Sequence, residues 1–259
     1  MISILVTLDA RYIPVLRVLL ASLLHSNREE TFALYLAYSS LTDEHLQSII
    51  ADSALEGAPI EKRYPREMYY RLFAAKFLPE TLDRILYLDP DIVVLNSIRP
   101  LYELDMGDNF FAAASHVKRS FQKFNNLRLE MPSGSAYVNS GVMMLNLTAL
   151  RAQQNPAEVF RYIEENKARM MLPDQDVLNA LYHDRILKLN PLIYNLSEKY
   201  FRHYNLSPKN EPIDLNWVRL HTVFMHYCGR NKPWKPNYIG KLDCFYHEAK
   251  ELLPPSATN

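Results

Sequence analysis

Short apolar runs alternate along the chain with longer segments in which apolar residues recur at helical spacing. Residues 2–7 form an apolar run that predicts a buried strand. Pro14 then stands where a helix begins, and the apolar residues between 15 and 23 follow a helical period. Residues 31–38 predict a second strand, and residues 42–50 a second helix. This alternation predicts an α/β fold with a mostly parallel central sheet flanked by helices.

The same alternation continues beyond residue 66. A helix is expected over residues 68–78, ended by Pro79. Residues 195–216 are polar and lack a clear period, so we expect a lid or an excursion there. We expect one domain over residues 1–250 and a flexible tail at 251–259. The remaining elements are strands over 84–88, 92–95, 110–114, 142–147 and 223–227, and helices over 156–169 and 174–182.

Composition and charge exclude several classes of protein. The 29 basic and 29 acidic residues among 259 give a net charge of zero, which argues against nucleic acid as a partner. No apolar run approaches the ~18 residues of a membrane span. The first residues lack a charged segment and reach Asp9 early, unlike a signal peptide. Cys228 and Cys244 form no metal-finger or disulfide pattern. We therefore expect a cytoplasmic protein with at most peripheral contact with the inner face of the membrane.

Glycine usage restricts how the chain could bind a nucleotide. The six glycines fit neither G-x-G-x-x-G nor G-x-x-x-x-G-K. A bound nucleotide must therefore be held by side chains or by a metal ion, because the sequence offers no glycine-rich phosphate loop.

The first candidate for chemistry is Asp89-Pro90-Asp91, which follows a predicted strand. Two carboxylates at positions i and i+2 can converge on one Mg²⁺ or Mn²⁺ ion, which favour hard oxygen ligands. Ligands of open α/β sheets bind at the carboxyl ends of strands, and this tripeptide lies at such an end. An ordinary Asp-Pro turn explains the tripeptide equally well.

The second candidate follows the last predicted strand. His226 could supply a nitrogen ligand to the same metal ion. Gly229 would allow the backbone to approach a ligand closely, and Lys232 could bind a phosphate as a point charge. The alternative is a structural histidine followed by a solvated basic loop.

Three weaker candidates lie between these two. Asp174 and Gln175 begin a predicted helix and could bind a polyhydroxylated ligand, although acidic residues are favoured in any first helical turn. The sequence Asn139-Ser140-Gly141 is either a turn or a ligand contact. Arg71 is either a surface charge or a phosphate clamp.

Taken in order, these blocks resemble glycosyltransferase family 8, a family of retaining nucleotide-sugar transferases. The resemblance implies one compact GT-A domain. It implies transfer of glucose or galactose from a UDP-sugar to a glycan, glycolipid or glycoprotein, with Mn²⁺ or Mg²⁺ activating the UDP leaving group. It spans residues 2–239 and is carried by residues 5–12, 70–72, 84–92, 137–142, 174–176 and 226–234.

The resemblance also assigns roles to residues. Asp89, Asp91 and His226 would hold the metal ion, and Asp174 and Gln175 would be the catalytic pair, with Gln175 stabilising a same-face attack. The expected donor-binding residues are Thr7, Asp9 and Tyr12 at the base, Arg71, Asn139, Asp174 and Gln175 at the sugar, Gly229 and Lys232 at the diphosphate, and Pro90, Ser140, Gly141 and His116 beside them.

Two departures from the galactosyltransferase pattern leave the donor sugar open. Arg11 stands where an Asn contacts the base, and His116 stands near the position of a sugar-binding Asp. Two other functions also stay open at this point: a metal-dependent nucleotide-sugar hydrolase or nucleotidyltransferase, and a non-catalytic UDP-sugar-binding module.

Overall fold

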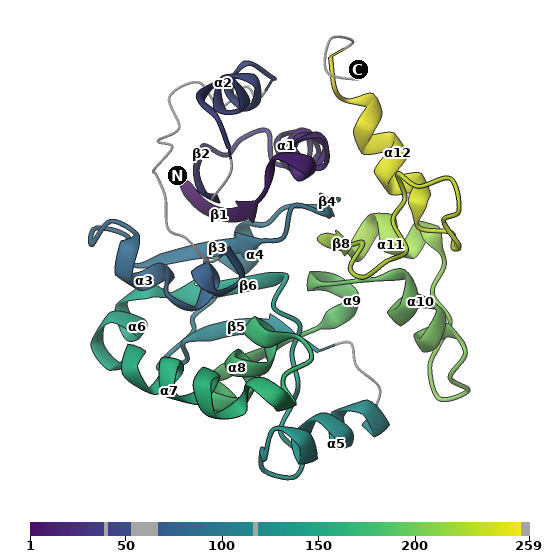
Figure 1. Cartoon of the computed structure of the whole chain (residues 1–259). Coiled ribbons are helices and arrows are strands. Elements are labelled where there is room, and N and C mark those ends of the chain that lie inside the picture. Colours follow the sequence, from purple (N-terminus) through teal and green to yellow (C-terminus); the bar gives the residue numbers. More distant parts are fainter. Residues whose placement is uncertain (39–40, 53–66, 116–118, 255–259) are drawn as a thin grey trace.

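A central sheet of six strands organises the molecule (Figure 1). In spatial order the strands are β2 (Phe32–Tyr38), β1 (Ile2–Leu8), β3 (Arg84–Leu88), β6 (Val142–Asn146), β5 (Phe111–Ala114) and β7 (Ile186–Leu189). β6 pairs antiparallel with β3 and β5, whereas the other neighbours in the sheet pair in parallel. Five strands therefore run in one direction, and the predicted mostly parallel sheet is confirmed. This computed structural model describes residues 1–38, 41–52, 67–115 and 119–254.

Helices cover both faces of this sheet, which is why all seven residues of β1 are buried. Ile4 and Val6 pack into one core cluster, while Leu5 packs into the cluster on the opposite face. The first cluster includes residues of α1 (Ile13–Ser26), α2 (Asp43–Asp52) and α4 (Arg99–Tyr102). The second includes residues of α3 (Ala74–Phe77), α6 (Leu147–Gln153), α7 (Pro156–Asn166) and α8 (Pro173–Tyr182).

A small second sheet connects the central sheet to the C-terminal helices. It pairs β4 (Ile92–Val94) with β8 (Phe224–His226) in antiparallel register, and Ile92 lies opposite His226. Val93 and Met225 enter a third core cluster with residues of α9 (Pro191–Tyr194), α10 (Glu198–Asn205), α11 (Leu215–His221) and α12 (Asp243–Glu251). The pairing brings the chain after β3 next to a segment about 130 residues later in the sequence.

Three short 3-10 helices and α5 (Arg119–Arg128) are the remaining elements of the residues that the structure describes. Among the described helices, none combines the length and the apolar character that crossing a bilayer requires. The 3-10 helices are η1 (Ala10–Tyr12), η2 (Glu67–Leu72) and η3 (Lys167–Arg169).

Two predicted elements differ from the structure. The helix expected over 68–78 is split at Phe73 into η2 and α3. At this break, the carbonyl of Leu72 accepts a hydrogen bond from the side-chain amide of Gln154 (2.8 Å). The segment 195–216, expected to be a lid or an excursion without regular structure, contains α10 and the start of α11. The expected tail is described as far as residue 254, and residues 255–259 lie outside the described residues.

Candidate metal and donor site

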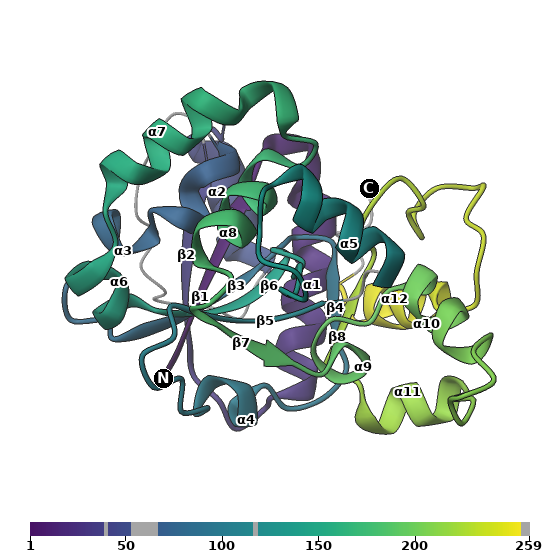
Figure 2. The same ribbon diagram turned by 90° about the horizontal axis from the view of Figure 1, so that it is seen from below.

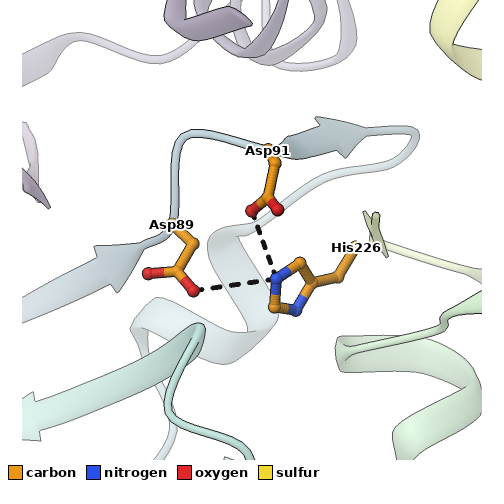
Figure 3. A group of neighbouring side chains, drawn as sticks. All are labelled: Asp89, Asp91 and His226. Atoms are coloured by element: carbon orange, nitrogen blue, oxygen red, sulfur yellow. Dashed lines mark ion pairs between the residues drawn. The ribbon is translucent and has the colours of Figure 1, made fainter. Parts of the chain in front are cut away.

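Three potential metal ligands meet where the two sheets join (Figure 3). Asp89 follows β3, Asp91 precedes β4, and His226 ends β8. The Nε2 atom of His226 lies 3.2 Å from Oδ1 of Asp91 and 3.7 Å from Oδ2 of Asp89. One ligand atom from each residue lies within 4.8 Å of the other two. The predicted grouping of these three side chains is therefore present in the fold.

Each carboxylate is held through the oxygen that points away from His226. Oδ1 of Asp89 accepts a hydrogen bond from the hydroxyl of Tyr87 (2.7 Å) and pairs with Nη2 of Arg71 (3.2 Å). Oδ2 of Asp91 pairs with the ammonium group of Lys232. The second oxygen of each carboxylate therefore faces the histidine. This is the arrangement in which outer contacts orient metal ligands.

Charge keeps Asp91 ionised despite its burial. Burial alone would raise the pKa of Asp91, but the neighbouring His226 and Lys232 lower it below its usual range. Two carboxylate oxygens and one imidazole nitrogen suit Mn²⁺ well and Mg²⁺ acceptably, so the donor set fits the cation that the sequence predicts.

Gly141 makes room for this cluster. A Cβ atom at this position would lie 2.2 Å from Cε1 of His226 and 2.7 Å from Oδ2 of Asp89. The carbonyl of Gly141 also accepts the backbone N–H of Asp89 (2.8 Å), which fixes the turn after β3. A residue without a side chain is therefore required where the turn meets the metal ligands.

A largely buried arginine links this cluster to α8. The Nε atom of Arg71 lies 3.2 Å from Oδ2 of Asp174, and its Nη1 atom donates to the carbonyl of Ser140 (2.9 Å). The guanidinium group lies 4.4 Å above the centre of the Tyr87 ring. Arg71 also pairs with Asp89, so one cation bridges two carboxylates and the loop before β6. The sequence left Arg71 as either a surface charge or a phosphate clamp. The surface charge is wrong, because only 12% of the Arg71 side chain is exposed.

Gln175 is held by the same loop. Its Oε1 atom accepts hydrogen bonds from Nδ2 of Asn139 (3.0 Å) and from the backbone N–H of Ser140 (3.2 Å). Burial raises the pKa of the adjacent Asp174, while the charge of Arg71 opposes this rise. The structure thus brings together the predicted residues Arg71, Asn139, Ser140, Asp174 and Gln175.

A second buried ion pair fixes α8 and was not predicted as a pair from the sequence. Asp176 is fully buried and pairs with Arg128 of α5 (2.7 Å). Its carboxylate also accepts from the hydroxyl of Tyr137 and from the backbone N–H of Met171 (2.7 Å). The side-chain amide of Asn179 accepts the backbone N–H of Val138 and donates to the carbonyl of the same residue. The Asp174-Gln175-Asp176 block contained a signal for Asp176, whereas nothing in the sequence pointed to Asn179.

The three residues predicted at the nucleotide base, Thr7, Asp9 and Tyr12, each contact a different partner. The hydroxyl of Thr7 lies 2.8 Å from the hydroxyl of Tyr87, which in turn donates to Asp89. Asp9 accepts from the backbone N–H of Arg11 (2.9 Å) and caps η1. The ring of Tyr12 lies edge-on to Trp234, with centroids 6.4 Å apart.

The loop after β8 carries the two residues predicted at the diphosphate. Gly229 has a φ of 84°, which a glycine adopts readily. The ammonium group of Lys232 lies 5.3 Å from the centre of the Trp234 ring and donates to the carbonyl of Tyr227 (2.9 Å). Pro90 lies between the two predicted carboxylate ligands. His116 lies outside the described residues.

Comparison with known proteins decides the family. Residues 3–237 match the model of glycosyl transferase family 8. The chain belongs to this family. It is 28% identical over 236 residues to a lipopolysaccharide 1,2-glucosyltransferase of Escherichia coli, which covers 83% of this chain and 68% of that protein. It is 26% identical over 204 residues to a lipopolysaccharide 1,3-galactosyltransferase of Salmonella typhimurium, which covers 77% of this chain and 58% of that protein.

Solved structures agree on the fold of this family 8 glycosyltransferase. The crystal structure of the galactosyltransferase LgtC in complex with donor and acceptor sugar analogs matches it with a TM-score of 0.83. The match covers 98% of both chains at 22% sequence identity. The predicted GT-A fold and the predicted family are therefore confirmed.

Proposed function

We propose that this glycosyltransferase moves a glucose or galactose residue from a UDP-sugar to a hydroxyl group of a glycan, glycolipid or glycoprotein, with retention of the anomeric configuration. The observation that carries the proposal is the convergence of Asp89 Oδ2, Asp91 Oδ1 and His226 Nε2 on one point. The relatives named as lipopolysaccharide glucosyltransferase and galactosyltransferase support a hexose as the transferred group and a cell-surface glycan as the acceptor.

Asp89, Asp91 and His226 would hold a divalent cation, which supplies Lewis-acid stabilisation of the charge that develops on the departing UDP. Arg71 adds a fixed positive charge beside it, held in place by Asp89 and Asp174. Because these groups are already oriented before the substrate binds, they need little reorganisation during the reaction.

The contacts of Gln175 favour a stabilising role over nucleophilic attack. Its Oε1 atom already accepts two hydrogen bonds, from Asn139 and from Ser140. A neutral amide oxygen engaged in this way is a weak nucleophile. Retention then follows from attack of the acceptor hydroxyl on the face that the diphosphate leaves, with Gln175 and Asp174 orienting the sugar.

Calorimetric titration with UDP, UDP-glucose and UDP-galactose tests the proposal, each in Mn²⁺ and in chelator. We expect binding of one sugar nucleotide that requires Mn²⁺ and is lost in Asp89→Asn. Substitution of the exposed Asp108 by Asn is the matched control and should bind like the wild type. Binding that is absent, or that is equally tight in chelator, would overturn the proposal.

Turnover separates the two other functions from the transferase. Release of UDP at full rate without any acceptor would identify a nucleotide-sugar hydrolase. Metal-dependent binding without turnover across a broad panel of glycan, glycolipid and glycoprotein acceptors would identify a binding module.

A further inference from the structure

The two ring nitrogens of His226 have different partners. Nε2 faces Asp89 and Asp91, whereas Nδ1 lies 2.9 Å from Oδ1 of Asn195. Asn195 is fully buried and follows α9, in the segment where the sequence predicted a lid or an excursion. In a neutral imidazole only the nitrogen without a proton can bind a metal ion. The partner of Nδ1 therefore decides whether Nε2 can act as a ligand.

A backbone group fixes the direction of every hydrogen bond in this chain of contacts. The N–H of Gly141 can only donate, so Oδ1 of Asn139, 3.0 Å away, is an acceptor. Nδ2 of Asn195 donates to the same oxygen (3.0 Å). The amide oxygen of Asn195 is then the atom that faces His226. A carbonyl oxygen can only accept, so Nδ1 carries the proton.

We infer that Asn195 is a positioning residue that holds His226 in the Nδ1-protonated tautomer and leaves the lone pair of Nε2 directed at the cation. The inference rests on the proposed function only for the presence of that cation. Asn139 contacts both Asn195 and Gln175, so the same residue orients the metal ligand and the sugar-side amide.

Two substitutions separate positioning from a merely structural role. Asn195→Leu keeps the size of the side chain but removes the acceptor. Asn195→Asp keeps an acceptor for Nδ1 and loses the donor to Asn139. Asn27→Leu removes another buried asparagine, which accepts the N–H of Ile98, and controls for a general loss of stability.

Long-range ¹⁵N NMR of the metal-free protein reads whether Nδ1 of His226 carries a proton, and electron paramagnetic resonance of free Mn²⁺ reads the affinity. We expect Asn195→Leu to leave Nδ1 without a proton and to lose about 10- to 100-fold in Mn²⁺ affinity. Asn195→Asp and Asn27→Leu should keep the proton on Nδ1 and stay within severalfold of the wild-type affinity.

The inference fails if Asn195→Leu keeps both the proton on Nδ1 and the affinity, or if Asn195→Asp loses affinity as much as Asn195→Leu. A wild-type protein that binds no Mn²⁺ would contradict the proposed metal dependence instead. The protonation of Nδ1 in the metal-free protein still tests Asn195 in that case.

A different part of the molecule carries a second inference. Among the described residues, five of the eleven large apolar side chains that are exposed gather on two segments. Phe121, Phe124 and Leu127 recur on one face of α5, and Leu127 is 82% exposed. Met171 and Leu172 directly precede α8, with 61% and 53% of their surface exposed. We call these five residues the apolar rim.

Hydrogen bonds join the two segments of the apolar rim. Arg128, next to Leu127, donates to the carbonyl of Arg169 (2.6 Å) and pairs with Asp176. The Asp176 carboxylate in turn accepts the backbone N–H groups of Met171 and Leu172. Figure 1 shows α5 at the lower edge of the molecule beside α8, and Figure 2 shows it facing the viewer between α8 and α10. Since α8 carries Asp174 and Gln175, the rim borders the sugar side of the site.

Basic residues accompany the apolar rim. The exposed Lys123 lies on α5 between Phe121 and Phe124. The exposed Lys199 of α10 reaches this face, with its ammonium group 5.9 Å from the centre of the Phe121 ring. Aromatic and leucine side chains beside lysines and arginines suit a surface with anionic headgroups over an apolar interior. Two copies of this face would bring like charges together, so self-association is the weaker alternative.

We propose that the apolar rim docks onto an anionic lipid bilayer and turns the sugar side of the site toward lipid-borne acceptors. The docking itself stands without the proposed function, and only the nature of the acceptor rests on it. No membrane-spanning segment is needed, because exposed apolar side chains and nearby basic charge act together at the headgroup level.

Sedimentation with lipid vesicles tests this docking. We expect the protein to bind phosphatidylglycerol-containing vesicles, to bind pure phosphatidylcholine vesicles at least tenfold more weakly, and to dissociate as salt is raised. The double variant Phe124→Ser/Leu127→Ser should lose at least tenfold in binding. The matched control Leu206→Ser/Leu220→Ser changes two exposed leucines outside the rim, one at the end of α10 and one in α11. It should bind like the wild type.

Three outcomes overturn the docking proposal: no vesicle binding by the wild type, an equal loss in the control variant, or a concentration-dependent dimer that the rim variant abolishes. UDP titration of the rim variant keeps this test separate from the proposed function. The rim residues lie outside the metal cluster, so nucleotide binding should be unchanged even when vesicle binding is lost.

Discussion

Gly141 and His226 approach so closely that a Cβ atom on residue 141 would lie 2.2 Å from Cε1 of the imidazole. The two residues are 85 positions apart in the sequence, and they meet because β6 lies beside β3 while β8 pairs with β4. The absence of a side chain at one position therefore determines where the imidazole of His226 can lie. The geometry of the cluster depends on a turn as much as on its three ligands.

Substitution Gly141→Ala should displace His226 or the turn that carries Asp89. We expect at least about a tenfold loss in Mn²⁺ affinity, the size seen when contacts behind a metal ligand are removed. Gly107→Ala is the control for backbone strain, since Gly107 has a φ of 50° and a Cβ atom there would meet no atom within 4 Å. Titration of Mn²⁺ followed by calorimetry checks this expectation, and equal affinities in the two variants would contradict it.

Tyr87 should orient Asp89 through its hydroxyl group. Burial raises the pKa of Tyr87 well above 10, so the hydroxyl stays protonated and donates to Asp89. Tyr87→Phe leaves Asp89 with Arg71 alone on that oxygen, and Mn²⁺ affinity should fall by about tenfold. Tyr182→Phe removes a buried hydroxyl that contacts Gln154 and should leave the affinity unchanged. Should both phenylalanine variants bind alike, Tyr87 does not orient the ligand.

Arg71 should require its guanidinium geometry and not only its charge. One planar group contacts Asp89, Asp174 and the carbonyl of Ser140, and a lysine ammonium cannot reach all three. Arg71→Lys should lower kcat/KM for UDP-sugar turnover by about a hundredfold, the scale observed when one preorganised donor is removed. Arg84→Lys, which alters contacts to two backbone carbonyls away from the site, should stay near the wild type. Steady-state kinetics with saturating Mn²⁺ decides between the outcomes.

The sequence was sufficient for the fold class and for the grouping of the metal ligands. Strands such as residues 2–7 and 84–88 are continuous apolar runs, because helices cover both faces of the sheet. Asp89 and Asp91 follow one of these runs directly. The residues alone left His226 as either a ligand or a structural histidine, and the family resemblance favoured the ligand, since spacing cannot show that β4 and β8 pair.

The contacts behind the ligands could not be predicted in the same way. Asn195 lies in a polar segment without periodicity, and only the fold brings it against His226. Arg128 is one of several basic residues on α5, and nothing nearby in the sequence marks it as the partner of Asp176. At the split between η2 and α3, the carbonyl of Leu72 accepts from Gln154, a residue 82 positions away in the sequence. Each of these features is a long-range contact with no local signal.

The ion pair between Arg128 and Asp176 should stabilise the protein in a pH-dependent way. Burial raises the pKa of Asp176, but hydrogen bonds from Arg128 and Tyr137 outweigh it and lower the pKa below the ordinary 3.8. A depressed pKa means that the stabilisation is present above pH 3.8 and is lost as the pH falls through the folded-state value. Arg128→Met leaves the buried carboxylate without its cation, and we expect a loss of about 3 kcal/mol in unfolding free energy at pH 7.

The control for this prediction is an equally well-formed pair on the surface. Arg219 pairs with Glu248 through two contacts of 2.7 Å, but both side chains are about half exposed. Arg219→Met should therefore cost less than about 1 kcal/mol. Urea unfolding of both variants and the wild type at pH 7 and at pH 3 measures the difference. The deficit of Arg128→Met should narrow at pH 3, because Asp176 is then protonated in the variant and in the unfolded chains. A deficit that is the same at both pH values would mean that Arg128 stabilises α8 through packing and not through its charge.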